Sequence, residues 1–315
     1  MFSRSKPSSY RSPLGAPNAT AVVPPDAFDC QLKCQCGQIV HSVHVHTPSA
    51  SLPLRCHCRQ CRRFHASAFA ALLPIQQSSL PPLGDDTMGS YTSACDGVGC
   101  ALRRFFCARC KTILCAIPES SDRSTCYVAM GSIEDESIPR VVAQAWQVCF
   151  EDRAHGQAAA WWKAAPASRG ARGSTCVLHG GCACGACRFE APTDDLFQTQ
   201  HCYCNLCRRL SGSVAQTWIP VRPRTFLWTS QAPLRLVRTT PHGQRHVCDA
   251  CGTTMTIVYD SQPDCIWPVA GVCDDETMPA DLSAALCRAI HICCEWQQPW
   301  YSLPDDGLPR LRYAG

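Results

Sequence analysis

Long hydrophobic runs are absent from this sequence of 315 residues. No stretch approaches the roughly 18 apolar residues that a membrane-spanning helix needs, so a membrane is not an expected partner. The first 28 residues contain no apolar segment long enough for the core of a secretory signal. We therefore expect a protein that is not secreted.

Charged residues are also scarce, at 17% of the sequence, and the net charge is only +4. Dedicated nucleic-acid-binding proteins concentrate more basic charge than this, so nucleic acid is not an expected partner either. Few stretches keep a helical period beyond one or two turns, which argues against a mainly helical fold. With 46% hydrophobic residues, the chain still has enough apolar side chains to build cores.

Cysteine, by contrast, is abundant, with 27 residues. Disulfide-rich secreted proteins share this property, but they are usually short and need a secretory signal. Many of these cysteines are only two or three residues apart, and side chains at that spacing converge on one metal ion from a turn. The sequence therefore predicts a cytoplasmic or nuclear protein whose paired cysteines bind zinc.

The cysteines recur in two copies of one pattern. Cys-x-Cys-x-x-Cys-Arg-Arg occurs at residues 56–63 and again at 202–209. Each copy follows Cys-x-Cys-Gly, at 34–37 and 182–185, and precedes Cys-x-x-Cys, at 107–110 and 248–251. Seven cysteines thus recur in the same order, 141 to 148 residues apart, which indicates an internal duplication. We call residues 28–150 the first repeat and residues 176–315 the second repeat.

The composition of the chain separates the remaining segments. Residues 1–27 are rich in proline and serine and predict a disordered tail, and residues 151–175 predict a linker. Short apolar runs bounded by turn residues predict strands, for example at 69–75, 214–221 and 254–259. Short helices are expected at 61–65 and 207–210. The predicted fold class is mainly β, with two tandem zinc-binding domains that contain short helices.

The number of ligands separates two kinds of metal site. Cys-x-Cys together with a distant Cys-x-x-Cys supplies the four thiolates of a closed, structural zinc site. Cys-x-Cys-x-x-Cys supplies three, and a three-ligand zinc keeps a position open for water or a substrate thiol, as catalytic sites do. A fourth protein ligand, or no metal at all, is the alternative for this motif. The closed sites comprise Cys34, Cys36, Cys107 and Cys110, and Cys182, Cys184, Cys248 and Cys251; the open sites comprise Cys56, Cys58 and Cys61, and Cys202, Cys204 and Cys207.

Thirteen cysteines lie outside these motifs, Cys95 and Cys293 among them. We expect most of them to be reduced and to act as small apolar residues.

The combined motifs resemble the glutathione-dependent formaldehyde-activating enzyme family, which also contains centromere protein V. The second repeat matches best, at 181–190, 202–213, 247–253, 289–292 and 303–309. The resemblance implies β-tent domains, each with one structural and one open zinc. It also implies an enzyme that handles glutathione or a related thiol adduct, formally a carbon–sulfur lyase that makes S-hydroxymethylglutathione. The alternative is a non-catalytic zinc module that binds protein or chromatin, as the centromere-protein branch suggests.

Glutathione carries two carboxylates, and arginine pairs well with carboxylates. Arg208 and Arg209, which follow Cys207, are therefore candidate substrate-binding residues, with a structural tether as the alternative for this pair. His291 is a third candidate for the pocket, with a buried strand histidine that is hydrogen-bonded to backbone as its alternative. No catalytic residue is identified by the sequence.

The first repeat departs from the shared pattern. It has Lys111 and Ala66 where the second repeat has Gly252 and Gly212, and it has no counterpart of His291. Because glycine suits a left-handed turn, Lys111 predicts strain or an altered turn. We therefore expect a folded first repeat with a reduced or different activity.

Overall fold

The computed structural model describes residues 27–46, 53–96, 99–120, 124–134, 138, 146–148, 154–155, 162–163, 177–192, 198–275, 289–303 and 305–314. The predicted tail and most of the predicted linker lie outside these residues. Two short strands, β10 (Ala154–His155) and β11 (Trp162–Lys163), fall within the linker and pair in parallel. The described residues contain no helix long and apolar enough to cross a membrane.

The first repeat is built on a sheet with the strand order β5-β6-β7-β8-β4-β3-β9, beside the antiparallel pair β1-β2. Its one described α-helix, α1, follows β3, and η2 follows β8. The elements are β1 (Ala27–Lys33), β2 (Val40–His46), β3 (Leu54–Cys56), α1 (Arg59–His65), β4 (Ala70–Gln76), η1 (Gln77–Ser79), β5 (Met88–Cys95), β6 (Cys100–Cys107), β7 (Ile113–Pro118), β8 (Thr125–Ala129), η2 (Met130–Ser132) and β9 (Trp146–Val148).

The second repeat has smaller sheets, with the orders β12-β13-β16, β15-β14-β21 and β17-β18-β19-β20. Its one described α-helix, α2, follows β14, as α1 follows β3. The elements are β12 (Val177–Gly181), β13 (Arg188–Pro192), β14 (Gln200–Cys202), α2 (Asn205–Ser211), β15 (Gln216–Trp218), η6 (Pro223–Thr225), β16 (Leu227–Ser230), β17 (Leu234–Thr240), β18 (Gly243–Cys248), β19 (Thr254–Tyr259), β20 (Ile266–Pro268), η7 (Ala270–Val272), β21 (Ile290–Ile292) and η9 (Cys294–Trp296).

The predicted mainly-β fold class is confirmed, because strands form most of the regular secondary structure of the described residues and the helices are short. The alternation in β2 has the expected physical cause. Val43 and Val45 are buried, while His44 and His46 are exposed, as the period of two in a strand requires. The apolar runs predicted at 69–75 and 254–259 correspond to β4 and β19.

Both predicted helices are present, and each begins two residues earlier than expected. The reason is their N-cap, which is a cysteine of the motif itself. The amides of Cys61 and Cys207 donate hydrogen bonds to the sulfurs of Cys58 and Cys204, at 3.5 and 3.4 Å. A side chain that accepts from an amide of the first turn satisfies a donor that the helix leaves free. The thiols that were predicted as metal ligands therefore also start the helices.

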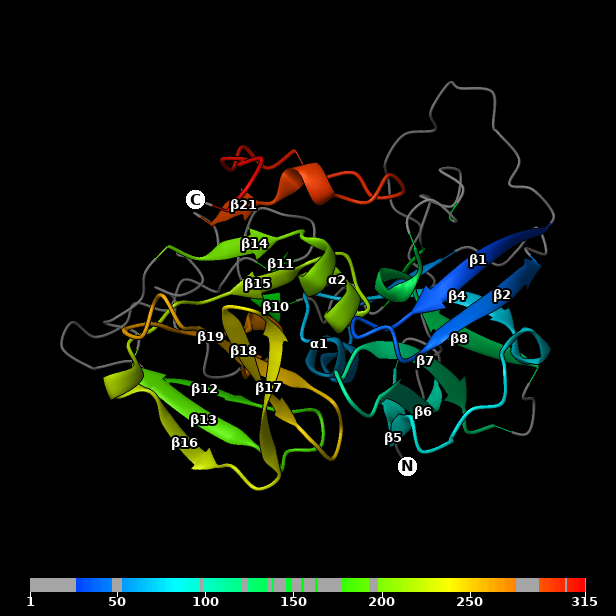
Figure 1. Ribbon diagram of the computed structural model, residues 1–315, viewed down its shortest axis with the longest axis horizontal. Helices are drawn as coiled ribbons and strands as arrows, with labels where there is room; N and C mark the ends of the chain where they lie inside the picture. The colour runs from blue at the N-terminus through cyan, green and yellow to red at the C-terminus, as the bar shows by residue number, and fades with distance from the viewer. Residues whose placement is uncertain are drawn as a thin grey trace, which may run out of the picture.

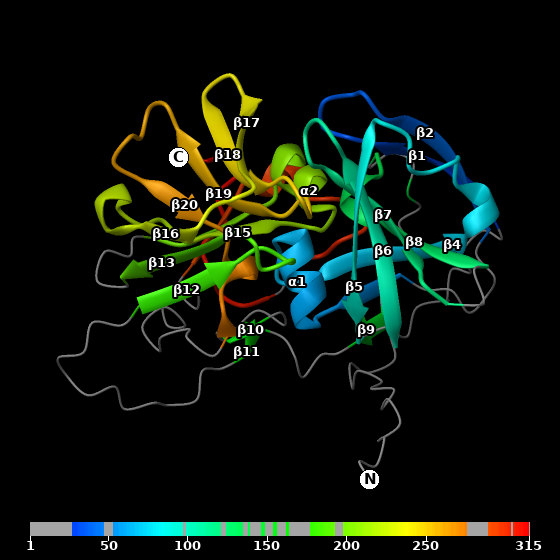
Figure 2. The same cartoon turned by 90° about the horizontal axis from the view of Figure 1, so that it is seen from below.

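The two repeats lie side by side, with α1 and α2 between them (Figures 1 and 2). Helix α1 packs against η7 of the second repeat, and α2 packs against η2 of the first. The hydrogen bonds follow the same reciprocity: the Ser67 hydroxyl donates to the Ala215 carbonyl at 2.8 Å, and the Ser213 hydroxyl donates to the Phe69 carbonyl at 2.7 Å. This is the arrangement of an isologous dimer, in which the same surface is used twice.

The close approach of the repeats depends on two glycines, one in η2 and one in η7. A Cβ atom added to Gly131 would lie 2.2 Å from the Ser213 carbonyl oxygen, and one added to Gly271 would lie 2.4 Å from the Ser67 nitrogen. No side chain fits at either position without a shift of backbone. The main hydrophobic cluster contains residues of both repeats, so the described parts of the two repeats share one core.

Candidate metal centres

Four groups of cysteine sulfurs come together in the structure, two in each repeat. Within each group, all sulfur atoms lie within 4.8 Å of one another. We name each group by its first residue. The Cys34 cluster comprises Cys34, Cys36, Cys107 and Cys110; the Cys56 cluster comprises Cys56, Cys58, Cys61 and Cys95; the Cys182 cluster comprises Cys182, Cys184, Cys248 and Cys251; the Cys202 cluster comprises Cys202, Cys204 and Cys207.

The spacing of the sulfurs suits a metal ion and not disulfides. In the Cys34 cluster, Cys36 lies 3.5 Å from Cys34 and 3.7 Å from Cys107. A disulfide needs a sulfur–sulfur distance of about 2.0 Å. A tetrahedron of sulfurs about 2.3 Å from a zinc ion has edges of roughly 3.8 Å. The donor set therefore fits zinc by both distance and chemistry.

The Cys34 and Cys182 clusters are built alike, and both tie an early turn to a late one. Backbone amides donate to their first sulfurs, from Ile39 to Cys34 at 3.2 Å and from Cys187 to Cys182 at 3.3 Å. A threonine two residues after each last cysteine also contacts its sulfur, at 3.2 Å in both repeats. Donors around a thiolate orient it and offset its charge, as outer partners of metal ligands do. These contacts fit two closed, structural sites.

The Cys56 cluster differs from the sequence prediction, because it contains a fourth thiol. Cys95, at the end of β5, lies 3.5 Å from Cys61 and 3.9 Å from Cys56. All four residues are buried. Cys95 is one of the thirteen cysteines of which most were expected to be small apolar residues, and here it lies with the three motif thiols, which favours the alternative of a fourth protein ligand. Cys95 could not be chosen from the sequence because its approach to the motif depends on where the β5-β6 hairpin lies.

The Cys202 cluster keeps three thiols and opens into a cavity of about 370 Å³. The cavity walls combine aromatic rings, two glutamine side chains and one cation, Arg245. Cys293 also lines the cavity, next to the three thiols. The lining residues are Gln200, Cys202, Cys204, Leu206, Cys207, Trp218, Thr240, Arg245, Ile257, Tyr259, Ser261, Gln262, Trp267, Ile292, Cys293 and Ala314.

Each three-cysteine motif also has a buried arginine beside its last sulfur. Arg104 of β6 contacts Cys61 and Arg245 of β18 contacts Cys207, both at 3.5 Å. Burial alone would lower the pKa of Arg104, but the Cys61 and Cys95 thiolates raise it above its ordinary value. Neither arginine was predicted from the sequence. A signal was present, since each lies three residues before a Cys-x-x-Cys pair.

The arginines that follow the motifs point elsewhere. Arg208 is buried and donates to the carbonyls of Gly131 and Ile133 in the first repeat, at 3.3 and 3.2 Å. Arg62 makes the reciprocal contact, from its Nη1 to Asp275 of the second repeat at 3.0 Å. The structure therefore places Arg208 as a tether between the repeats and not among the residues that line the cavity, which favours the alternative of a structural tether. Arg209 is half-buried, and it too does not line the cavity.

His291 is fully buried in β21 and does not line the cavity either. Its Nδ1 lies 2.9 Å from the Tyr203 hydroxyl, and its Nε2 lies 3.1 Å from Asp306. Burial lowers the pKa of His291, and the Asp306 carboxylate opposes this shift. The alternative of a buried strand histidine describes His291, although its partners are side chains and not the backbone that this alternative named.

The two positions where the first repeat lacks glycine keep the glycine-like backbone. Lys111 has φ +61° where Gly252 has +76°, and Ala66 has φ +46° where Gly212 has +63°. The turn at Lys111 is therefore not altered. Its ammonium group lies 2.6 Å from the Asp249 carboxylate of the second repeat and 5.0 Å from the centre of the Phe106 ring.

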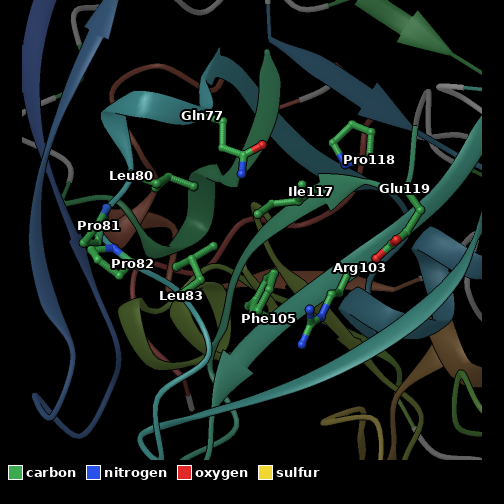
Figure 3. Close-up of a pocket in the computed structure, with 10 residues that line it drawn as sticks. All are labelled: Gln77, Leu80, Pro81, Pro82, Leu83, Arg103, Phe105, Ile117, Pro118 and Glu119. Carbon is green, nitrogen blue, oxygen red and sulfur yellow. The ribbon is translucent and has the colours of Figure 1, made fainter. Parts of the chain in front are cut away.

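A second cavity, of about 430 Å³, lies between the β6-β7 face and the segment that follows β4 (Figure 3). Arg103 and Glu119 lie on one side of it, and Pro81 and Pro82 lie on the other. Arg103 and Arg104 are neighbours on β6 and point to opposite faces of the strand. Because Arg104 faces the Cys56 cluster, this cavity lies on the other side of β6 and is separate from the sulfur clusters.

The fold and the four clusters together define a tandem-repeat β protein with four groups of thiols that could hold metal ions. The family model for the glutathione-dependent formaldehyde-activating enzyme matches residues 29–148 and 177–292. The chain therefore belongs to this family, with one matched segment in each repeat.

A relative of known sequence agrees with this assignment, and a solved structure is similar to part of the chain. A Halomonas elongata protein, assigned provisionally as a glutathione-dependent formaldehyde-activating enzyme, is 24% identical over 149 residues, which are 44% of this chain and 88% of the relative. A crystal structure of a Rhodobacter sphaeroides protein has 20% sequence identity and a TM-score of 0.26. It covers 33% of this chain and 94% of that protein.

Proposed function

We propose that the second repeat is a zinc-dependent enzyme that acts on glutathione or on related thiol adducts of small electrophiles, as a carbon–sulfur lyase of the S-hydroxymethylglutathione synthase type. The observation that carries the proposal is the three-thiol Cys202 cluster at the floor of a cavity. In the direction of synthesis, the thiol sulfur bonds to the carbonyl carbon of the electrophile. The π bond of that carbonyl breaks, and the thiol proton passes to its oxygen. No oxidant or reductant is needed.

The residues of the Cys202 cluster fit a zinc ion with one free position. Zinc held in this way supplies Lewis acidity and lowers the pKa of a thiol that binds to it. Arg245 would offset the negative charge of the thiolates in the Cys202 cluster. Its guanidinium group lies 3.5 Å from the Cys207 sulfur and stacks 5.5 Å from the centre of the Trp218 ring. A fixed buried cation favours the thiolate form of a bound thiol and attracts the carboxylates of glutathione.

The cavity walls favour a substrate with an apolar part and several amides. Trp218, Tyr259 and Trp267 present aromatic surface, and Gln200 and Gln262 present amide groups. A volume of about 370 Å³ lies within the ordinary range for small-molecule sites. Glutathione has this mixed character. The cavity is the feature that supports an enzyme over the non-catalytic binding module.

Calorimetry with glutathione tests the proposal, because the duplication supplies a matched pair of variants. The Cys207→Ser variant should lose glutathione binding, since it removes one of the three thiolates below the cavity. The Cys61→Ser variant makes the equivalent change in the first repeat and should bind glutathione as the wild type does. Zinc content and circular dichroism of both variants control for unfolding.

The outcomes separate the two functional classes. Binding that is lost in Cys207→Ser and kept in Cys61→Ser supports the enzyme and places it in the second repeat. Loss in Cys61→Ser alone would move the activity to the first repeat. If the folded, zinc-loaded wild type does not bind glutathione at all, the enzyme proposal fails and the protein-binding or chromatin-binding module replaces it.

A further inference from the structure

In the Cys56 cluster, a fourth thiol from a different element lies within 4.8 Å of all three motif sulfurs. In the second repeat, Cys293 contacts Cys202 and Cys204 but does not lie this close to all three motif sulfurs. Cys95 lies at the end of the β5-β6 hairpin, where it pairs with Cys100. The corresponding hairpin of the second repeat, β17-β18, has no cysteine before Cys248 at its last position. Thr240, near the turn of that hairpin, lines the cavity instead.

We propose that Cys95 makes the Cys56 cluster a closed four-thiolate zinc site that acts as a structural cross-link and has no position for a substrate thiol. All four residues are at most 2% exposed, so an external thiol has no route to the metal without an opening of the structure. A tetrahedral set of four sulfurs suits zinc or iron, and zinc needs no redox partner. Zinc is therefore the expected ion.

The residues around the Cys56 cluster can stabilise the negative charge of a zinc ion that is bound by four thiolates. Zinc with four thiolates is doubly negative, and a buried charge is costly unless it is paired. Arg104, fully buried, contacts the Cys61 sulfur at 3.5 Å and offsets part of this charge. The Ser93 hydroxyl accepts a hydrogen bond from Arg104 Nε at 2.9 Å and holds the guanidinium group in place.

The cross-link joins α1 to the end of β5, two elements that lie far apart in the sequence. Cys58 and Cys61 fix the start of α1, and Cys95 lies 34 residues further along the chain from Cys61, at the end of β5. Because α1 packs against η7 of the second repeat, the metal also fixes the hairpin relative to the interface. Closure of a loop of this length stabilises the folded chain by lowering the entropy of the unfolded one.

Thiol alkylation of the wild-type protein, mapped by mass spectrometry with and without a zinc chelator, is the first test. Cys95 should be protected while the metal is bound, and it should become reactive in step with Cys56, Cys58 and Cys61 when the metal is removed. Cys100, its neighbour across the hairpin, should react at a rate that does not depend on the metal. If Cys95 reacts while the other three stay protected, the proposal fails.

Substitution of Cys95 is the second test, with Cys100→Ser as the matched control. Cys95→Ser should lower the zinc content by about one ion per chain or make that ion release to a chelator at least tenfold faster, while Cys100→Ser should match the wild type. In the cobalt-loaded protein, Cys95→Ser should also weaken the thiolate-to-metal absorption. A folded Cys95→Ser variant with unchanged zinc content, release rate and cobalt spectrum would overturn the proposal.

The wild-type alkylation result decides the matter if Cys95→Ser does not fold. Elemental analysis of the same sample reports the identity of the ion, and iron in place of zinc would overturn the zinc assignment. Glutathione binding at the Cys202 cluster is independent of these measurements, so the two proposals can fail separately.

Discussion

At the scale of single residues, Lys111 holds a backbone conformation that usually belongs to glycine. Its φ of +61° costs an L-residue about 1–2 kcal/mol relative to a right-handed conformation. The side chain offsets this cost through contacts across the interface between the repeats. Its ammonium group is almost fully buried between the Asp249 carboxylate and the Phe106 ring. The contacts of the Lys111 side chain therefore compensate for the cost of its backbone conformation.

Two substitutions separate these contributions. Lys111→Ala keeps the strained backbone and removes the contacts, so it should destabilise the protein. Lys111→Gly removes the contacts and the strain together, and it should be more stable than Lys111→Ala by about 1 kcal/mol. Urea unfolding of the three proteins with zinc bound measures the differences. Equal stability of the two variants would mean that the backbone at Lys111 is not strained.

At the scale of elements, helix α1 ends in a histidine that joins the two repeats. His65 is fully buried, and its Nδ1 donates to the Ser211 carbonyl of α2 at 2.8 Å. Burial, with a smaller contribution from the Arg104 charge, lowers the pKa of His65 to about 3. The folded protein therefore holds this ring neutral at every pH near neutrality.

This histidine should make stability depend on pH. Below pH 6.5 the unfolded chain protonates His65, whereas the folded chain does not until about pH 3, so stability falls as the pH falls through this range. The loss is at most about 1.4 kcal/mol for each pH unit. His65→Asn keeps a donor and cannot take up a proton. Urea midpoints at pH 7.5 and 5.5 should differ less for His65→Asn than for the wild type.

Thiolate protonation also weakens zinc binding in acid, and this effect is common to both proteins. The difference in acid response between the wild type and His65→Asn therefore measures the contribution of His65 alone. An equal acid response of wild type and His65→Asn would show that His65 does not contribute.

The elements also show what the sequence could and could not predict. The spacing of the cysteines within each motif was enough to predict which thiols of one motif come together and to place the start of both helices within two residues, because local spacing determines these features. Cys95 could not be found in this way, since its approach to Cys61 depends on how β5 pairs with β6 and on where the hairpin lies. The tether role of Arg208 likewise depends on contacts with a segment 75 residues away.

At the scale of the whole molecule, the two repeats pack against each other as the subunits of a homodimer do, although they belong to one chain. Each repeat buries an arginine of its motif against the other, and each presents a glycine where the backbones meet. A repeat without its partner would leave Arg62 or Arg208 without these acceptors. It would also expose to water the apolar side chains of the shared core.

Residues 28–150 and 176–315, expressed separately, should therefore be poorly soluble or should self-associate through the exposed surface. Co-expression should give a one-to-one complex, measurable by analytical ultracentrifugation. Two stable monomers that do not bind one another, each melting at the temperature of the full chain, would contradict the shared core. For this reason repeat-specific substitutions in the full chain are the better test of activity.

The contact between Lys111 and Asp249 shows which substitutions each of the two repeats can accept. In a homodimer every substitution is made in both subunits at once. A lysine at the equivalent position 252 would collide with Phe106, whose ring atoms lie 2.6 Å from the Cβ that Gly252 lacks. Lys111 is therefore tolerated in one copy and excluded from the other. Covalent linkage of the two repeats allows a position to change in one copy while the equivalent position in the other copy stays as it was.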